Sequence, residues 1–331
     1  MSARPPTTPT PSPQPPVLPP EISALLTPIA QYKARSHSTS LSHHLPLLSS
    51  PSLPAGYPQV VLLGDSMIER MTTTGLSPSI TAPWPSAHLL PDSDNLFPSS
   101  LLRGSNQQPN DSPDLNPSSD STDQAPRLPY VFNAGVGGDK IQNLAYRLLG
   151  SPSSSDNNRP PLPSLGAALA ERNSVKLWVL QIGTNNLFPK HGLKDSDLDA
   201  LRNLLQSLLL LGNKSKVLVT GLFYRKDISR DKIDDANGRI RGLVVEMDGL
   251  LKEQHDNKME GADEGEEAGE WEKLDKEGEK DEETEKRLIF LPAADGVDVE
   301  RRLVDHVHLS LEGYRIWMAT LFPEVVRVLH R

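Results

Sequence analysis

The sequence predicts an α/β fold of three layers, in which five parallel strands form one sheet and helices cover both of its faces. Short apolar runs alternate five times along the chain with segments of helical periodicity. The first run, Val60–Leu63, has no polar position, which is typical of a strand buried on both faces of a parallel sheet. Turn residues follow the runs, so we expect right-handed helical crossovers between the strands.

Local patterns define the expected elements. The segment from Met67 to about residue 74 suits a helix, and the segment 139–149 places Ile141, Leu144 and Leu148 on one helical face. Residues 231–252 show the same apolar spacing and predict a long helix. The other strands are expected at 128–132, 175–182, 216–222 and 287–291, and the other helices at 21–26, 165–172, 198–211 and 310–329.

Composition divides the chain into one folded domain and several polar segments. The 31 prolines of the 331-residue chain gather in segments with few apolar residues, which cannot bury enough surface to form a core. Residues 1–57 are expected to be a disordered tail and lead-in, with a loop from Arg35 to Pro58, and residues 58–331 the folded domain. Low-complexity insertions are expected between elements, at about 76–127, 150–163 and 255–286.

One segment carries the net charge of the chain. The formal charge is −9, and residues 256–286 contain 15 Asp or Glu and 5 Lys, which amounts to −10. The remainder is near neutral, so we expect no nucleic-acid surface. The chain has no cysteine and no apolar run long enough for a membrane span or a secretory signal. We therefore expect a cytoplasmic protein, and no cofactor or metal.

The first strand ends at Gly64-Asp65-Ser66, where a helix is expected to begin. A serine at such a turn directs its hydroxyl out of the sheet edge at which open α/β sheets bind ligands. The first N–H groups of the helix lie beside it and stabilise negative charge. Ser66 is therefore a candidate nucleophile, and the alternative is that it only caps the helix.

Three further breaks in the pattern complete a candidate catalytic group. A serine becomes a good nucleophile when a histidine, oriented by a carboxylate, accepts its proton. Asp305 and His308 supply this pair three residues apart, and His306 is the competing base, although a side chain adjacent to Asp305 tends to point away from it. The N–H groups of Ser66 and Gly138 and the side-chain amide of Asn185 are the expected oxyanion hole.

These blocks resemble those of the SGNH (GDSL-type) hydrolases, in the order found in that family. Gly64-Asp65-Ser66, the glycine block 133–139, Gly183-Thr184-Asn185 and the Asp-x-x-His block 305–308 match. The resemblance extends from Val60 to about Leu329 without the tail and the insertions. It implies that Ser66 is the nucleophile, His308 the base and Asp305 its orienting group, with Gly138 and Asn185 in the oxyanion hole.

Within the family, the blocks are most similar to the catalytic subunits of intracellular platelet-activating factor acetylhydrolase. That similarity implies a flavodoxin-like sheet, a homodimer and a WD40-repeat regulatory partner, although the long insertions depart from the pattern. We expect a serine esterase for a small-acyl ester, such as an acetyl ester of a phospholipid. Met67, Thr184 and Val307 would line the acyl pocket, or they are simply core residues. The alternatives are a carbohydrate O-deacetylase, an acyltransferase, or a catalytically silent scaffold.

Overall fold

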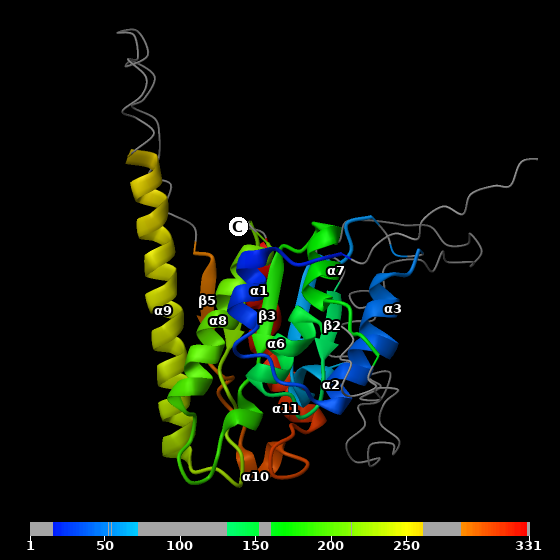
Figure 1. The fold of residues 1–331 in the computed structure, drawn as a ribbon. Coiled ribbons are helices and arrows are strands. Elements are labelled where there is room, and N and C mark those ends of the chain that lie inside the picture. Colours follow the sequence, from blue (N-terminus) through cyan, green and yellow to red (C-terminus); the bar gives the residue numbers. More distant parts are fainter. Residues whose placement is uncertain are drawn as a thin grey trace, which may run out of the picture.

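The protein forms one five-stranded parallel sheet with helices on both faces, which confirms the predicted fold class (Figure 1). The computed structural model describes residues 16–51, 53, 55–71, 131–151, 160–212, 214–260 and 286–329. The strand order β2-β1-β3-β4-β5 is that of flavodoxin-like sheets. The strands are β1 (Val60–Gly64), β2 (Val131–Gly135), β3 (Leu177–Gln181), β4 (Lys216–Thr220) and β5 (Leu288–Leu291).

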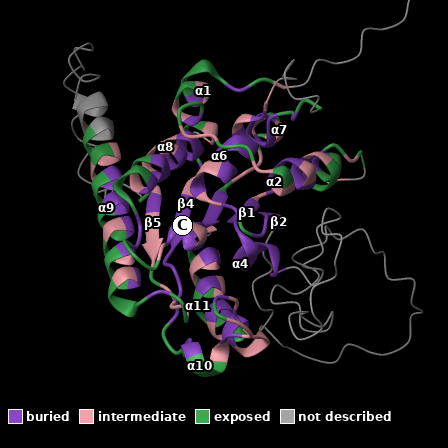
Figure 2. Ribbon diagram, turned by 60° about the horizontal axis from the view of Figure 1, so that its bottom comes forward, coloured by how far each residue is buried: buried purple, intermediate pink, exposed green. Residues whose placement is uncertain are grey.

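Alternate strand residues build two hydrophobic cores, one on each face of the sheet. Val61 and Leu63 point into the larger core with the helices α1, α6, α7, α8 and α9. Val60 and Leu62 point into the smaller core, under α4 and α11. Figure 2 shows the buried strands between these two helix layers. Every residue of β1 is buried, as its unbroken apolar pattern predicts.

The helices of the sheet domain agree with the predictions except at some ends and except for the short helix Val299–Arg302, which lies in a segment expected to be a loop. They are α4 (Ser66–Glu69), α6 (Ile141–Leu149), α7 (Leu165–Arg172), α8 (Asp195–Leu211), α9 (Arg230–Glu260), α10 (Val299–Arg302) and α11 (Leu311–Leu329). α9 continues past the predicted end at residue 252, because Lys252–Glu260 is rich in good helix formers. β2 continues past residue 132, because Asn133 and Gly135 remain paired with β1.

The predicted loop from Arg35 to Pro58 is wrong over most of its length. Helices α2 (Ala34–Thr39) and α3 (Leu45–Leu48) flank a π-helical turn at Ser40–His44. Leu45 and Leu48 are buried in the larger core, together with Ile22 and Leu26 of the predicted short helix α1 (Pro20–Leu26). The serine- and histidine-rich composition conceals these helices, because several of the polar side chains are themselves buried.

Several of the predicted polar segments lie outside the described residues. These are the tail before residue 16, the insertion at 76–127, residues 152–159 of the insertion at 150–163, and residues 261–285 of the acidic insertion. Within the described part of the chain, no helix combines the length and apolar character that a membrane crossing requires.

Candidate active site

Ser66 is the first residue of α4, directly beyond the carboxyl end of β1. The N-cap of this helix is Asp65, whose Oδ1 accepts the Met67 N–H at 2.9 Å. The alternative in which Ser66 merely caps the helix is therefore wrong. Because the cap is supplied by its neighbour, the Ser66 hydroxyl is left to interact with groups across the sheet edge.

The Ser66 hydroxyl meets a histidine from the loop between α10 and α11. His308 Nε2 lies 2.9 Å from Ser66 Oγ, and His308 Nδ1 lies 2.7 Å from Asp305 Oδ2. The adjacent His306 is exposed, and its backbone carbonyl accepts the Lys226 N–H at 2.8 Å. The geometry thus joins Ser66, His308 and Asp305 in one hydrogen-bonded series, and the neighbouring imidazole is not part of it.

Asp305 is held in its ionised form by its own loop. Burial raises the pKa of this carboxyl, but three hydrogen bonds outweigh that effect and hold the pKa well below its usual range. Its Oδ1 accepts the N–H groups of Val307 at 2.8 Å and His308 at 2.7 Å, while Oδ2 accepts the imidazole. A permanently charged Asp305 can therefore keep the proton of His308 on Nδ1 and leave Nε2 as an acceptor.

The three predicted oxyanion donors lie on three different elements. Ser66 begins α4, Gly138 is in the turn after β2 with a φ of +74°, and Asn185 is in the turn after β3. Among the described residues, no acceptor is bound by the backbone N–H of Ser66 or Gly138. The Asn185 amide donates to the Asp139 carbonyl at 3.0 Å and to Asp65 Oδ2 at 3.3 Å.

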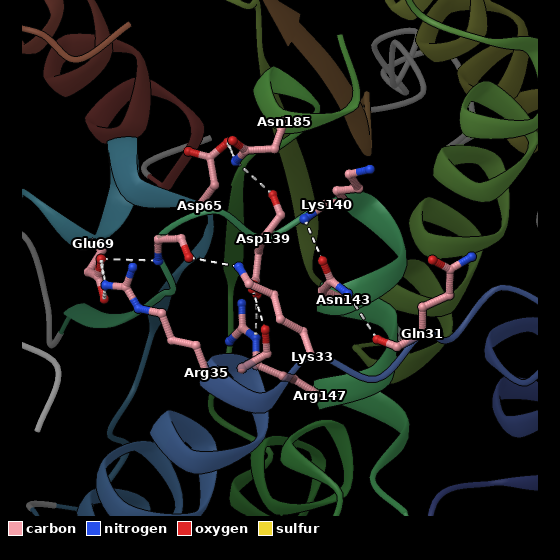
Figure 3. A network of polar contacts seen from close by, with 12 residues as sticks. Gln31, Lys33, Arg35, Asp65, Glu69, Asp139, Lys140, Asn143, Arg147 and Asn185 are labelled. Carbon is pink, nitrogen blue, oxygen red and sulfur yellow. Dashed lines mark hydrogen bonds and ion pairs between the residues drawn. The ribbon is translucent and has the colours of Figure 1, made fainter. Parts of the chain in front are cut away.

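A buried charged network supports the turn that contains Gly138 (Figure 3). Asp139 and Arg147 are fully buried, and Arg147 Nε donates to Asp139 Oδ2 at 2.9 Å. Arg147 also donates to the Ala134 carbonyl at 2.8 Å, which anchors the end of β2. On the other side of the turn, Gly137 N–H donates to Glu69 Oε2 at 3.0 Å. Sequence reasoning missed Glu69 and Arg147 as parts of the site.

One signal in the sequence could have identified Arg147. It lies three residues after Leu144 and beside Leu148, on the apolar stripe of α6, where a charged side chain must be paired to be buried. No comparable signal marks Glu69, because α4 is only one turn long.

Asp65 has an unusual environment beside Asn185. It is completely buried, and burial raises the pKa of its carboxyl to about 7, although the Met67 N–H and the Thr184 hydroxyl act in the opposite direction. The charge of Asp139 adds to the rise. The protonation of Asp65 is therefore sensitive to pH in a range where a normal aspartate would be fully ionised.

The three predicted pocket residues are all buried. Met67 and Val307 are 1% and 9% exposed, and the Thr184 hydroxyl interacts with Asp65 and accepts from Gln181 at 3.3 Å. A cavity of about 420 Å³ lies further along the same sheet edge, beyond β4 and β5, and none of the three lines it. Their role in an acyl pocket remains a prediction. The described residues contain no group of three potential metal ligands close enough to hold an ion.

Comparison with known proteins identifies similar folds only. No protein-family model and no curated protein matches the chain. A carbohydrate acetylesterase from Sinorhizobium meliloti aligns at 14% identity and a TM-score of 0.43, covering 81% of this chain and 98% of the other. The M. smegmatis aryl esterase aligns at 13% identity and a TM-score of 0.43, covering 82% of this chain and 98% of the other. A carbohydrate esterase family 3 protein from Talaromyces cellulolyticus aligns at 16% identity and a TM-score of 0.39, covering 82% of this chain and 97% of the other. At these identities and TM-scores, function must be argued from the site.

Proposed function

We propose that the protein is a serine esterase of the SGNH type, which hydrolyses a carboxylic ester through an acyl-enzyme. One observation carries the proposal, namely the continuous series from Ser66 Oγ through the His308 imidazole to the Asp305 carboxylate. A hydroxyl, an imidazole and a carboxylate in this order are what nucleophilic acyl transfer requires. Their position at the carboxyl edge of a parallel sheet leaves one side of Ser66 for a substrate.

The proposed reaction has two stages. In the first, His308 Nε2 accepts the Ser66 proton while Oγ attacks the ester carbonyl, and the protonated imidazole then returns the proton to the leaving alcohol. In the second, water attacks the acyl-enzyme with His308 as the base, the bond from the acyl carbon to Ser66 Oγ breaks, and His308 returns the proton to Oγ as the carboxylic acid leaves. The oxyanion would be stabilised in both stages by three donors, which are the backbone N–H groups of Ser66 and Gly138 and the Asn185 amide. Each donor would lower the activation barrier by on the order of 3 kcal/mol.

We propose that the preferred substrate is an ester with a small acyl group, such as an acetyl ester of a phospholipid. Met67, Thr184 and Val307 flank the catalytic positions in the sequence and are buried, and their bulk supports this choice. A homodimer and a WD40-type regulatory partner are part of the same proposal, and they rest on the sequence resemblance alone. The proposed cytoplasmic location rests on composition.

The proposal is tested by labelling with a fluorophosphonate, followed by mass spectrometry of the modified peptide. We expect a single adduct on Ser66 in the wild type and none in Ser66→Ala, with an unchanged melting temperature. Ser310→Ala is a matched control, because Ser310 caps α11 at 3.2 Å from the Gly313 nitrogen and should not affect labelling. An adduct on another residue, or full labelling of Ser66→Ala, would exclude Ser66 as the nucleophile.

The substrate class is tested on wild-type protein that has not been treated with the fluorophosphonate. With p-nitrophenyl esters of increasing chain length, we expect kcat/KM to be highest for acetate and to fall steadily beyond butyrate. A preference for long chains would contradict the small acyl pocket. Product formation from acetylated sugars, or transfer of the acyl group to an added alcohol instead of water, would favour the deacetylase or the acyltransferase. A wild type that reacts with neither probe nor esters would favour the scaffold.

A further inference from the structure

The lead-in before the sheet provides a lysine to the turn that contains the proposed oxyanion donor. Lys33 Nζ donates to the Gly137 carbonyl at 2.8 Å and to Asp139 Oδ1 at 3.3 Å. Lys33 and Gly137 are 104 residues apart along the chain, and helix α2, which begins just after Lys33, contacts α6. Figure 3 shows Lys33 and Arg35 approaching this turn from the lead-in.

The bond to the Gly137 carbonyl fixes one particular peptide group. The carbonyl of Gly137 and the N–H of Gly138 belong to the same peptide, which is planar and trans. When the carbonyl points at the ammonium, the N–H must point away from it. A charged donor on the carbonyl also withdraws electron density, which makes the N–H of the same peptide a stronger donor.

The glycines of this turn leave room for the Lys33 side chain, and their flexibility means that the turn needs the support of that side chain. A Cβ on Gly138 would lie 2.9 Å from Lys33 Nζ, and the residue has a φ of +74°, which other residues rarely adopt. A Cβ on Gly137 would lie 2.5 Å from Arg35 Nη1. Because glycine is so flexible, this turn needs support from outside to hold one orientation of its peptides.

We propose that Lys33 is a positioning residue of the active site, whose ammonium group orients and polarises the Gly137–Gly138 peptide so that the Gly138 N–H faces the substrate oxyanion. The inference rests on the proposed esterase function and adds the lead-in to its machinery. Lys33 does not touch the substrate; it acts through the peptide that does.

A second contact from the lead-in holds the preceding peptide. Arg35 Nη2 lies 2.9 and 2.8 Å from the two Glu69 oxygens, and Glu69 Oε2 accepts the Gly137 N–H at 3.0 Å. Burial raises the pKa of Glu69, and the charge of Arg35 opposes that rise, which favours the ionised acceptor. Both peptides that flank Gly137 are therefore bonded to charged groups, and in each case the lead-in supplies a cation.

The test compares Lys33→Met with the wild type in steady-state esterase kinetics and in the rate of fluorophosphonate labelling. We expect kcat and the labelling rate to fall about 10- to 100-fold, which is no more than the fall caused by removing one oxyanion donor. KM should stay within twofold of the wild-type value. Lys33→Arg, which keeps the charge, should recover most of the loss. The control is Lys216→Met, since Lys216 donates to the Val328 carbonyl at 3.0 Å near the opposite end of the sheet. That control should retain full activity.

The possible outcomes separate this inference from the proposed function. If wild-type Ser66 is not labelled, the esterase proposal fails; if it is labelled and Lys33→Met reacts at the wild-type rate, only the role of Lys33 fails. A change in KM alone would also overturn the role of Lys33.

If Lys33→Met does not fold, the dependence of kcat on alkaline pH in the wild type and in Lys33→Arg decides. Burial lowers the pKa of Lys33 despite the neighbouring Asp139, while Arg35 and Arg147 add to the lowering. Wild-type kcat should therefore fall at alkaline pH, and Lys33→Arg should shift the fall upward. Identical profiles would contradict the proposal.

Discussion

The two sides of the Ser66 hydroxyl are built in different ways. On the base side, Asp305 and His308 lie on one short loop, and their side chains are 23% and 17% exposed. On the donor side, the turn after β2 is supported by Asp139 and Arg147, which are both fully buried. The base side is assembled from residues three positions apart, whereas the donor side depends on charges from four separate segments.

This difference indicates that activity and stability are concentrated on opposite sides. Partly exposed groups contribute less to folding than fully buried ones, so substitutions on the base side should remove activity and cost less stability than those on the donor side. Buried ion pairs are costly to break, so substitutions on the donor side should destabilise the protein as well. The predictions below test that separation, from the largest effect to the smallest.

The base itself should give the largest effect. We expect His308→Gln to lower kcat by about 10⁵-fold, since removing a triad base leaves only binding and the oxyanion hole. His306→Gln should stay within about threefold of the wild type, because its side chain is exposed. The measurement is kcat/KM for a p-nitrophenyl ester, with melting temperature as the check on folding. An inactive His306→Gln beside an active His308→Gln would reverse the assignment of the base.

Asp305→Asn should have the next largest effect and should lower kcat by about 10⁴-fold. The amide cannot keep the His308 proton on Nδ1 in the same way, so the wrong tautomer would face Ser66. Because the pKa of Asp305 is depressed in the folded state, the ionised carboxylate stabilises the fold above the unfolded pKa, near 4, and this contribution is lost as the pH falls. Denaturant unfolding of both proteins from pH 7 to pH 3 should therefore show a stability difference that is constant at neutral pH and begins to narrow below about pH 4.

Arg147→Met should destabilise the protein by about 3–5 kcal/mol, because it removes the fully buried cation of the Asp139 carboxylate and leaves only the more distant Lys33. The matched control is Arg202→Met, which breaks the surface pair with Glu246 and should cost less than about 1 kcal/mol. Urea unfolding measures both. Equal costs for the two variants would show that the donor side is not the stable half of the site.

Asp65→Asn should produce the smallest effect, and one of opposite sign to that of Asp305. The raised pKa of Asp65 means that the folded protein binds its proton more tightly than the unfolded chain, so wild-type stability falls as the pH rises from about 4 to about 7. Asparagine can keep the cap to Met67 without this penalty. We expect the variant to gain stability relative to the wild type steadily as the pH rises between those values. A constant difference across the range would contradict a buried, titrating Asp65.

Local patterns were sufficient to predict the sheet and the base side of the site. The unbroken apolar run of β1, the alternation of strands and helices and the three-residue spacing of Asp305 and His308 are all properties of neighbouring residues. A strand buried on both faces and a dyad on one turn need no information from distant segments. The fold class and the pairing of Asp305 with His308 could be anticipated for that reason, whereas the meeting of His308 with Ser66, 242 residues away, was implied by the family resemblance.

The support of the donor turn was decided by the tertiary structure alone. Lys33, Glu69 and Arg147 belong to segments that are far apart in the chain, and composition marked the first of them as part of a disordered lead-in. Periodicity records which face of an element is apolar, but not which distant charge will neutralise a buried one. Only the packing of α2, α4 and α6 beside the sheet brings these charges together around the turn that contains Gly137 and Gly138.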